Sequence, residues 1–195
     1  MSNDASVPFR RIEGYAIVSE DGMIADAKGN TPDTLKFEAD RRFFESGIDG
    51  VDLVVHGRHS REQQPGSGSR RRLILTREIP GVAADRSNEN AVLWNPAGAS
   101  FEQALTALGK PDSRIGILGG TAVFSLFLHR YDVFHLSRVP RVRLPGGRPV
   151  FQEVPMRSPE GVLATHGLRP GSRRVLDPAH GVTVVSWLRS PPSDR

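Results

Sequence analysis

The stretch from residue 114 to residue 128 constrains the fold of this chain more than any other. An apolar run of strand length ends at Gly119 and Gly120, and an apolar run with helical spacing follows at once. This pattern predicts a strand, a tight turn and a helix. Because glycine has no Cβ, the pair would let an anion such as a dinucleotide pyrophosphate approach the first amides of the helix. The pair would equally serve close contact between helix and strand, so the glycines alone do not decide between the two.

Length and composition bound the class of protein. The 195 residues are 37% hydrophobic and 25% charged, which fits a single domain over residues 1–195, with a core at about 12–155 and a tail at 156–195. The absence of cysteine excludes disulfides, thiolate metal sites and a cysteine nucleophile. The first residues lack the features of a signal peptide, and no apolar run approaches the ~20 residues of a transmembrane helix. We therefore expect a soluble, cytoplasmic protein with no membrane partner.

The basic residues are almost all arginines. The net charge is +4, and all but three of the 26 basic residues are arginine, with clusters at 70–72, 141–148 and 173–174. Such clusters usually form a solvated surface, but arginines also capture phosphorylated ligands or nucleic acid. Aromatic residues make up only 7% and do not interleave with the arginines. A single-strand stacking platform would require that interleaving, so we expect no nucleic-acid partner.

Apolar runs bounded by turn residues predict strands at 12–18, 51–57, 72–76, 91–94, 114–118 and 131–139. Helical spacing predicts helices at 32–46, 58–62, 101–108 and from 121 to about 129, with Ser100 and Gln103 as a capping box for the third. In the tail we predict a hairpin of strands 161–168 and 182–188. The alternation predicts an α/β fold with a mostly parallel sheet and antiparallel strands at the C-terminal edge. Ligands would bind at the carboxyl ends of the parallel strands, where Gly57 and Gly119 fall.

Six groups of residues follow one another in a characteristic order. They are Ala16-Ile17 before Asp21-Gly22-Met23-Ile24, Asp40 with Phe44, His56-Gly57-Arg58-His59-Ser60, Leu75-Thr76-Arg77, Leu118-Gly119-Gly120, and Tyr131-Asp132 with Leu136-Ser137. Their order and spacing resemble the dihydrofolate reductase superfamily over residues 12–151. Residues 19–25 and 144–151 look more like the reductase domain of the bifunctional riboflavin-biosynthesis deaminase-reductase. The resemblance implies a three-layer dihydrofolate reductase-like fold, an NADPH-dependent oxidoreductase and a homodimer.

The resemblance also implies a complete NADPH site. Phosphates of the cofactor would bind at Gly57, Arg58, His59 and Ser60, the adenosine 2′-phosphate at Thr76 and Arg77, and the pyrophosphate beside Leu118, Gly119, Gly120, Thr121 and Ala122, with a cis peptide between the two glycines. The nicotinamide would rest against Ala16, Ile17, Ile24 and Ala25, and Ala25 would also face the substrate. An arginine at position 77 has the bidentate fork that favours NADP over NAD.

By the same resemblance, Asp40 matches the carboxylate that pairs with the substrate ring and assists its protonation as hydride arrives. An anion in an apolar cleft beside Phe44 would hold a flat heterocycle with a donor edge. Ser137 matches a hydroxyl position near that carboxylate. A solvated helix acid is the alternative interpretation of Asp40, and three nearby acids compete for its role: Asp33, Glu38 and Glu45.

Two departures from the family bear on the substrate. The Pro-Trp pair of folate reductases is replaced by the polar segment 26–30, and the glutamate that riboflavin enzymes usually carry before the glycine pair is Leu118 here. The first choice is a 5-amino-6-(5-phosphoribosylamino)uracil reductase, and the alternative is a dihydrofolate or pteridine reductase. A catalytically inactive binding or scaffold protein of the same fold is a further alternative. His56 and His59 have no evident third ligand, so we expect no metal.

Overall fold

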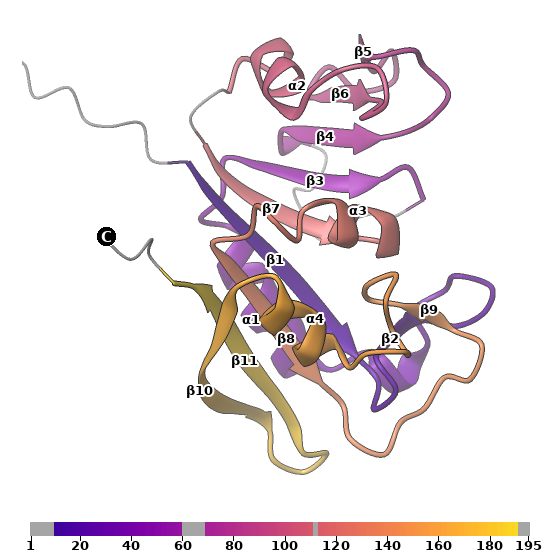
Figure 1. Cartoon of the computed structure of the whole chain (residues 1–195), viewed down its shortest axis with the longest axis vertical. Coiled ribbons are helices and arrows are strands. Elements are labelled where there is room, and N and C mark those ends of the chain that lie inside the picture. Colours follow the sequence, from indigo (N-terminus) through magenta and orange to yellow (C-terminus); the bar gives the residue numbers. More distant parts are fainter. Residues whose placement is uncertain (1–9, 60–68, 111–112, 191–195) are drawn as a thin grey trace, which may run out of the picture.

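The computed structural model describes residues 10–59, 69–110 and 113–190, which form a nine-stranded sheet and a separate two-stranded sheet (Figure 1). The strand order in the large sheet is β10-β11-β8-β1-β7-β3-β4-β6-β5. The strands of this sheet are β1 (Arg11–Val18), β3 (Leu53–Gly57), β4 (Arg72–Leu75), β5 (Val82–Ala84), β6 (Ala91–Trp94), β7 (Arg114–Gly119), β8 (Val133–Arg138), β10 (Leu168–Asp177) and β11 (Val182–Arg189). The small sheet pairs β2 (Met23–Ala25) with β9 (Arg148–Pro149).

The body of the large sheet is parallel, and its C-terminal edge is antiparallel. Strands β8, β1, β7, β3, β4 and β6 run parallel to one another. Strand β11 pairs antiparallel with β8 and with β10, and β5 adds an antiparallel strand at the other edge. The predicted α/β class, with its mostly parallel sheet and antiparallel C-terminal strands, is confirmed.

Helices cover both faces of the sheet. Helix α1 (Glu38–Ile48) lies on one face, and α2 (Phe101–Ala107), α3 (Thr121–Leu126) and α4 (Pro159–Thr165) lie on the other (Figure 1). Side chains alternate along β1, so Tyr15 faces α1 while Gly14 faces the opposite layer. That layer is filled by aromatic rings in mutual contact, among them Phe124, Phe134 and Phe151. The predicted three-layer arrangement is confirmed.

Several predicted helix boundaries need correction. The first helix begins at Glu38 rather than at residue 32, because Asp33–Leu35 forms a separate 3₁₀ turn and the backbone is extended at Phe37. Helix α3 ends at Leu126, three residues early. Of the helix predicted at 58–62, residues 58 and 59 lie in a turn, and the others are outside the described residues. The Ser100 and Gln103 capping box is confirmed by bonds of 3.1 and 2.7 Å.

The strand predicted at residues 161–168 is wrong. Residues 159–165 form α4, whose start is stabilised by Ser158 Oγ, which accepts the amide of Gly161 at 3.1 Å, and by Pro159 in the first turn. The buried pair Val162 and Leu163 fits one helical turn as well as a strand, so periodicity alone misassigns it. The first strand of the terminal hairpin is instead β10, and its turn lies at residues 178–181.

Candidate active site

Three segments of the predicted NADPH site lie at the same edge of the sheet. In register, Gly57 of β3 lies opposite Leu75 of β4, and His56 lies opposite Gly119 of β7. The amide of Arg58 donates to the Leu75 carbonyl at 3.1 Å, which joins the two strand ends. The carboxyl ends of neighbouring parallel strands therefore bring the segments that follow Gly57, Leu75 and Gly119 side by side.

The glycine corner has the geometry that its sequence predicts. The peptide bond between Gly119 and Gly120 is cis, as the resemblance implies. Gly119 has φ +95°, and a Cβ there would lie 2.5 Å from the ring of Phe124. Helix α3 begins directly after Gly120 without a side-chain cap, so the amides of Thr121 and Ala122 have no partner within the helix. Because α3 is short, these amides, rather than a long helix dipole, are what the corner offers to an anion.

The turn after β4 carries Arg77, whose guanidinium has no partner among the described residues. Buried Thr76 accepts the amide of Glu78 on its Oγ1 at 3.2 Å and so fixes the turn. Arg77 is exposed, and within the described part of the chain its side chain has no hydrogen bond or ion pair. Arg58 forms an ion pair with Glu78 instead of standing free. Glu78 was not among the residues predicted from the sequence, and Ser60, which was, lies outside the described residues.

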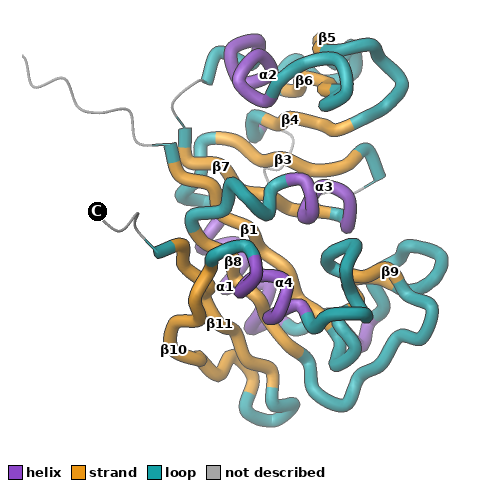
Figure 2. The backbone as a smooth tube through the Cα atoms, in the orientation of Figure 1, coloured by secondary structure: helices purple, strands orange, loops and turns teal. Residues whose placement is uncertain are grey.

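The predicted nicotinamide wall lies where β1 ends. Ala16 and Ile17 occupy the carboxyl half of β1, and Ile24 and Ala25 belong to β2, which follows β1 after a tight turn. In that turn the Ser19 amide donates to the Met23 carbonyl at 3.0 Å. Strand β2 is held from its other side by β9, and Figure 2 shows that much of the chain around this small sheet is loop. The four residues thus belong to two separate sheets that a tight turn connects.

Asp40 stands on the first part of α1 and reaches Ser137 of β8, the residue opposite Ile17 of β1. Burial raises the pKa of the Asp40 carboxyl above its usual value, and the hydrogen bond with the Ser137 hydroxyl works in the opposite direction. Phe44, one turn further along, packs edge-on against Tyr15 with ring centroids 5.8 Å apart.

The competing acids have different surroundings. Asp33 pairs with Lys36 at 2.8 Å, and Glu38 and Glu45 each bind Arg41 at 2.7 Å. These are helix-surface ion pairs in which both Asp33 and Glu38 are exposed. Burial raises the pKa of Asp40, whereas the ion-pair partners of Asp33 and Glu38 lower the pKa of those two acids. A carboxyl with a raised pKa can hold a proton closer to neutral pH, which suits it to proton exchange with a bound ring.

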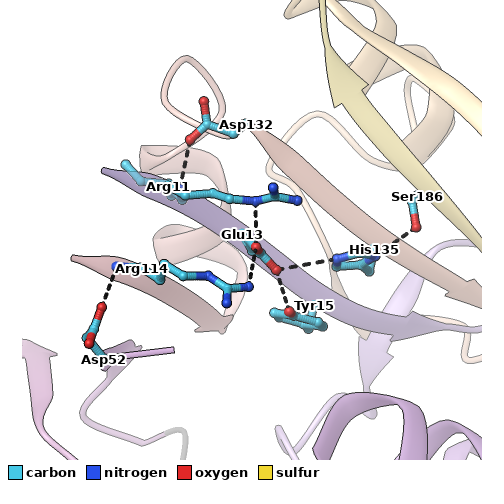
Figure 3. Close-up of polar contacts among 9 residues, drawn as sticks. Arg11, Glu13, Tyr15, Asp52, Arg114, Asp132, His135 and Ser186 are labelled. Carbon is cyan, nitrogen blue, oxygen red and sulfur yellow. Dashed lines mark hydrogen bonds and ion pairs between the residues drawn. The ribbon is translucent and has the colours of Figure 1, made fainter. Parts of the chain in front are cut away.

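A second buried carboxylate, Glu13 of β1, lies at the centre of a cluster of polar contacts (Figure 3) and was not predicted as a site residue from the sequence. It contacts four side chains: Tyr15 Oη at 2.6 Å, Arg11 Nε at 2.7 Å, Arg114 Nη2 at 3.3 Å and His135 Nε2 at 3.6 Å. The hydrogen bond with His135 contributes most to lowering the pKa of Glu13 to about 2, against the opposing effect of burial. The feature of the sequence that could have identified Glu13 is that it is a charged residue within an apolar strand.

The Glu13 cluster supports the helix that carries Asp40. His135 stacks on Tyr15 at 4.7 Å and meets the ring of Phe43 at 5.4 Å. Its Nδ1 is 2.9 Å from the hydroxyl of Ser186 on β11. The rings on β1 and β8 therefore form the surface on which α1 packs.

Two surface depressions flank β10 rather than the carboxyl edge. One, of about 220 Å³, lies against β8, β11 and α4, and the other, of about 350 Å³, lies between α1 and β10. Neither is lined by a residue predicted to bind cofactor or substrate. The candidate site is therefore identified by its hydrogen-bond donors and charged groups rather than by a cavity. Among the described residues, no group of three histidine, aspartate or glutamate side chains could hold a metal ion, and no helix is long and apolar enough to cross a bilayer.

No protein-family model matches this chain, and no curated protein sequence matches it. Solved structures do. A candidate riboflavin biosynthesis protein from Shewanella sp. PV-4 superposes with a TM-score of 0.64 at 20% identity, covering 93% of this chain and 99% of that one. Dihydrofolate reductase from Enterococcus faecalis, complexed with NADP(H), gives 0.62 at 18%, covering 93% and 97%.

A third similar structure is the diaminohydroxyphosphoribosylaminopyrimidine deaminase/5-amino-6-(5-phosphoribosylamino)uracil reductase from Thermotoga maritima. It gives a TM-score of 0.61 at 16% identity, and the match covers 93% of this chain but 57% of that longer one. These three likenesses establish the fold. The chain has the dihydrofolate reductase-like fold, which it shares with this deaminase/reductase.

Proposed function

We propose that this protein is an NADPH-dependent reductase of a small, flat nitrogen heterocycle. The observation that carries the proposal is the contact of Asp40, whose pKa burial raises, with Ser137 near the carboxyl ends of β1 and β8. A partly buried acid with one hydroxyl partner needs a further partner to offset its lost hydration. The N–H edge of a heterocycle is such a partner. We also propose that residues 1–195 act as one domain and that the protein is a cytoplasmic homodimer.

The donor groups at the sheet edge fit a phosphorylated cofactor. The guanidiniums of Arg58 and Arg77, with the free amides after Gly120, are groups that bind phosphate oxygens in proteins. Bound NADPH would supply hydride from its nicotinamide, and NADP(H) is bound in the structurally similar Enterococcus faecalis enzyme. The segment Ala16-Ile17 of β1 would lie beside the ring. Because side chains alternate along a strand, Ala16 and Ile17 point to opposite faces of the sheet, and one of the two would pack against the ring.

Asp40 would orient the substrate and would hold and transfer one proton. Its carboxylate would accept N–H donors of the ring, and its raised pKa favours holding a proton and passing it to the ring or to a bound water as reduction proceeds. Ser137 would hold the carboxyl in one orientation through their hydrogen bond. Phe44 would cover a face of the ring.

The riboflavin-pathway substrate 5-amino-6-(5-phosphoribosylamino)uracil is the first choice. Residues 26–30, which stand where folate reductases carry Pro-Trp, close into a polar turn in which the Asn30 amide donates to Asp26 Oδ1 at 2.8 Å. This turn offers no large apolar side chain to a pterin. One of the three similar structures is named as a riboflavin biosynthesis protein, and another is named as a 5-amino-6-(5-phosphoribosylamino)uracil reductase joined to a deaminase. Dihydrofolate or another pteridine is the alternative, and an inactive scaffold of the same fold is the competing function.

Direct titration with NADPH and NADH tests the cofactor. Wild-type protein should bind NADPH more tightly, and Arg77→Ala should weaken NADPH by about tenfold or more while changing NADH little, because a charge-assisted bond to the 2′-phosphate is lost. Arg86→Ala, which removes an exposed arginine from the opposite end of the sheet, is the matched control. Equal losses for both nucleotides would contradict the 2′-phosphate assignment. No binding of either would favour the scaffold.

Turnover of the reduced pyrimidine and of dihydrofolate tests the chemistry. Asp40→Asn should abolish turnover and leave NADPH binding intact, since the amide keeps the shape but cannot exchange the proton. Asp33→Asn, at an exposed acid just before the same helix, is the control. Unchanged turnover in Asp40→Asn would remove Asp40 from the mechanism.

A further inference from the structure

Glu78 lies beside the two arginines of the proposed cofactor site. Arg58 follows β3 and Glu78 follows β4, and because these strands are parallel neighbours, the two side chains meet as an ion pair across the strand ends. Arg77 is adjacent in the chain to Glu78 and has no such partner among the described residues. The ends of β3 and β4 are thus followed by two arginines and one glutamate.

Main-chain bonds on both sides fix the position of this pair. The Arg58 amide is bonded to the Leu75 carbonyl, and the Glu78 amide is bonded to Thr76 Oγ1. On the far side, Asn95 Nδ2 donates to the Ile79 carbonyl at 2.7 Å. The meeting of Arg58 and Glu78 therefore follows from the ends of adjacent strands rather than from two loose loops.

The pair is accessible to a ligand. The Arg58 and Glu78 side chains are 45% and 64% exposed. Ion pairs in such high-dielectric surroundings contribute little to folding, so stability does not account for the presence of Glu78 here. The same exposure leaves the Arg58 guanidinium free to exchange one anionic partner for another.

We propose that the adenosine 2′-phosphate bound at Arg77 also contacts Arg58, and that Glu78 sets the cofactor preference by competing with this phosphate for the Arg58 guanidinium; this inference rests on the proposed function. A 2′-phosphate must displace the carboxylate from the guanidinium and then remain near its negative charge, which opposes NADPH binding. NADH has a hydroxyl in the same place, and a carboxylate can accept a hydrogen bond from it. Arg77 and Glu78, neighbours in sequence, therefore act in opposite directions on the choice of cofactor.

Glu78→Gln tests the proposal, because the amide keeps the size of the side chain and removes its charge. Dissociation constants would be measured by calorimetry for NADPH, NADH, adenosine 2′,5′-bisphosphate and 5′-AMP, so that the readout is binding and not activity. We expect NADPH and the bisphosphate to bind about three- to fivefold more tightly, and NADH and 5′-AMP to change less than about twofold. Glu89→Gln, an exposed glutamate at the amino end of β6, is the control with the same charge change.

A double variant shows whether Glu78 acts through Arg58. In an Arg58→Ala background, Glu78→Gln should no longer improve NADPH binding, because the group for which it competes is gone. A gain that persists in this background would overturn the proposal. So would an unchanged or weakened NADPH affinity in Glu78→Gln, and the cofactor assignment would then stand as long as wild type still prefers NADPH. Failure of wild type and variant to bind any of the four nucleotides would overturn both proposals.

Discussion

The hydroxyl of Tyr15 donates a 2.6 Å hydrogen bond to Glu13 Oε2, two residues earlier on the same face of β1. Both side chains are buried, and the Tyr15 ring also stacks on His135 and meets Phe44 edge-on. One buried carboxylate is thereby linked to the aromatic surface beneath α1. The helix that carries Asp40 rests on this unit.

Glu13→Gln should lower the free energy of unfolding by about 2 kcal/mol near neutral pH, because the charged partners of Glu13 lose their counter-charge. The folded-state pKa, about 2, lies below the reference value of 4.5, so the stabilisation by ionised Glu13 is complete above pH 4.5 and is lost as the pH falls toward 2. Urea unfolding across this range measures it. A difference that does not vary with pH would contradict the assignment, and exposed Glu89→Gln is the control.

Asp40→Asn should raise the free energy of unfolding near neutral pH, whereas Glu13→Gln should lower it. Burial raises the pKa of Asp40 above its reference value of 3.8, so ionised Asp40 destabilises the fold above its folded-state pKa, and the penalty disappears below pH 3.8. The variant should therefore show a higher urea midpoint than wild type near neutral pH and the same midpoint in acid. A lower midpoint at neutral pH would show that Asp40 is needed for folding rather than held for function.

Gly119→Ala and Gly109→Ala separate backbone strain from steric overlap. Both glycines have positive φ, +95° and +71°, but a Cβ on Gly119 would lie 2.5 Å from Phe124, while one on Gly109 meets no described atom within 4 Å. We expect Gly109→Ala to cost about 1 kcal/mol from backbone strain alone and Gly119→Ala about 3 kcal/mol. Denaturant unfolding measures both. Equal losses would mean that Phe124 moves aside without cost.

Arg189→Lys should destabilise the C-terminal edge. The guanidinium donates to three backbone carbonyls, those of Tyr131 at 2.6 Å, His166 at 2.9 Å and Leu128 at 3.0 Å. A lysine cannot span all three, so unfolding free energy should fall by about 2 kcal/mol. Arg169→Lys is the control, since Arg169 is exposed and its side chain bonds one serine hydroxyl. Similar small losses in both variants would show that the three bonds contribute little.

Much of the fold follows from local patterns. Runs of β-branched and other apolar residues that end at glycine predict β3 and β7 within a residue or two, and Ser100 with Gln103 predicts the start of α2. Strands β2, β5 and β9 were missed because two or three residues carry no periodicity. The tail was misassigned because the apolar pair in α4 fits helix and strand alike.

Of the candidate site, the glycines after β3 and β7 follow from local patterns, whereas Asp40, Ser137 and the other site residues were implied by the family resemblance. The glycine corners and the acid of α1 were predicted on the right elements, and the structure brings Asp40 to Ser137. Their roles in binding and catalysis stay predictions. Glu78 could not be selected, because its sequence neighbourhood is that of any solvated acid.

By itself the sequence determined where strands end, which glycines follow them, and hence which residues line the carboxyl edge, since these depend on backbone preference and nearby side chains. Only the tertiary structure decided which carboxylates carry unusual surroundings. Asp33, Glu38 and Asp40 are chemically alike in the sequence, but Asp40 alone of the three is partly buried against a strand almost a hundred residues away. Glu13 and Glu78 likewise take partners from other strands. Burial and long-range pairing set charge and pKa, and both arise only when distant segments meet.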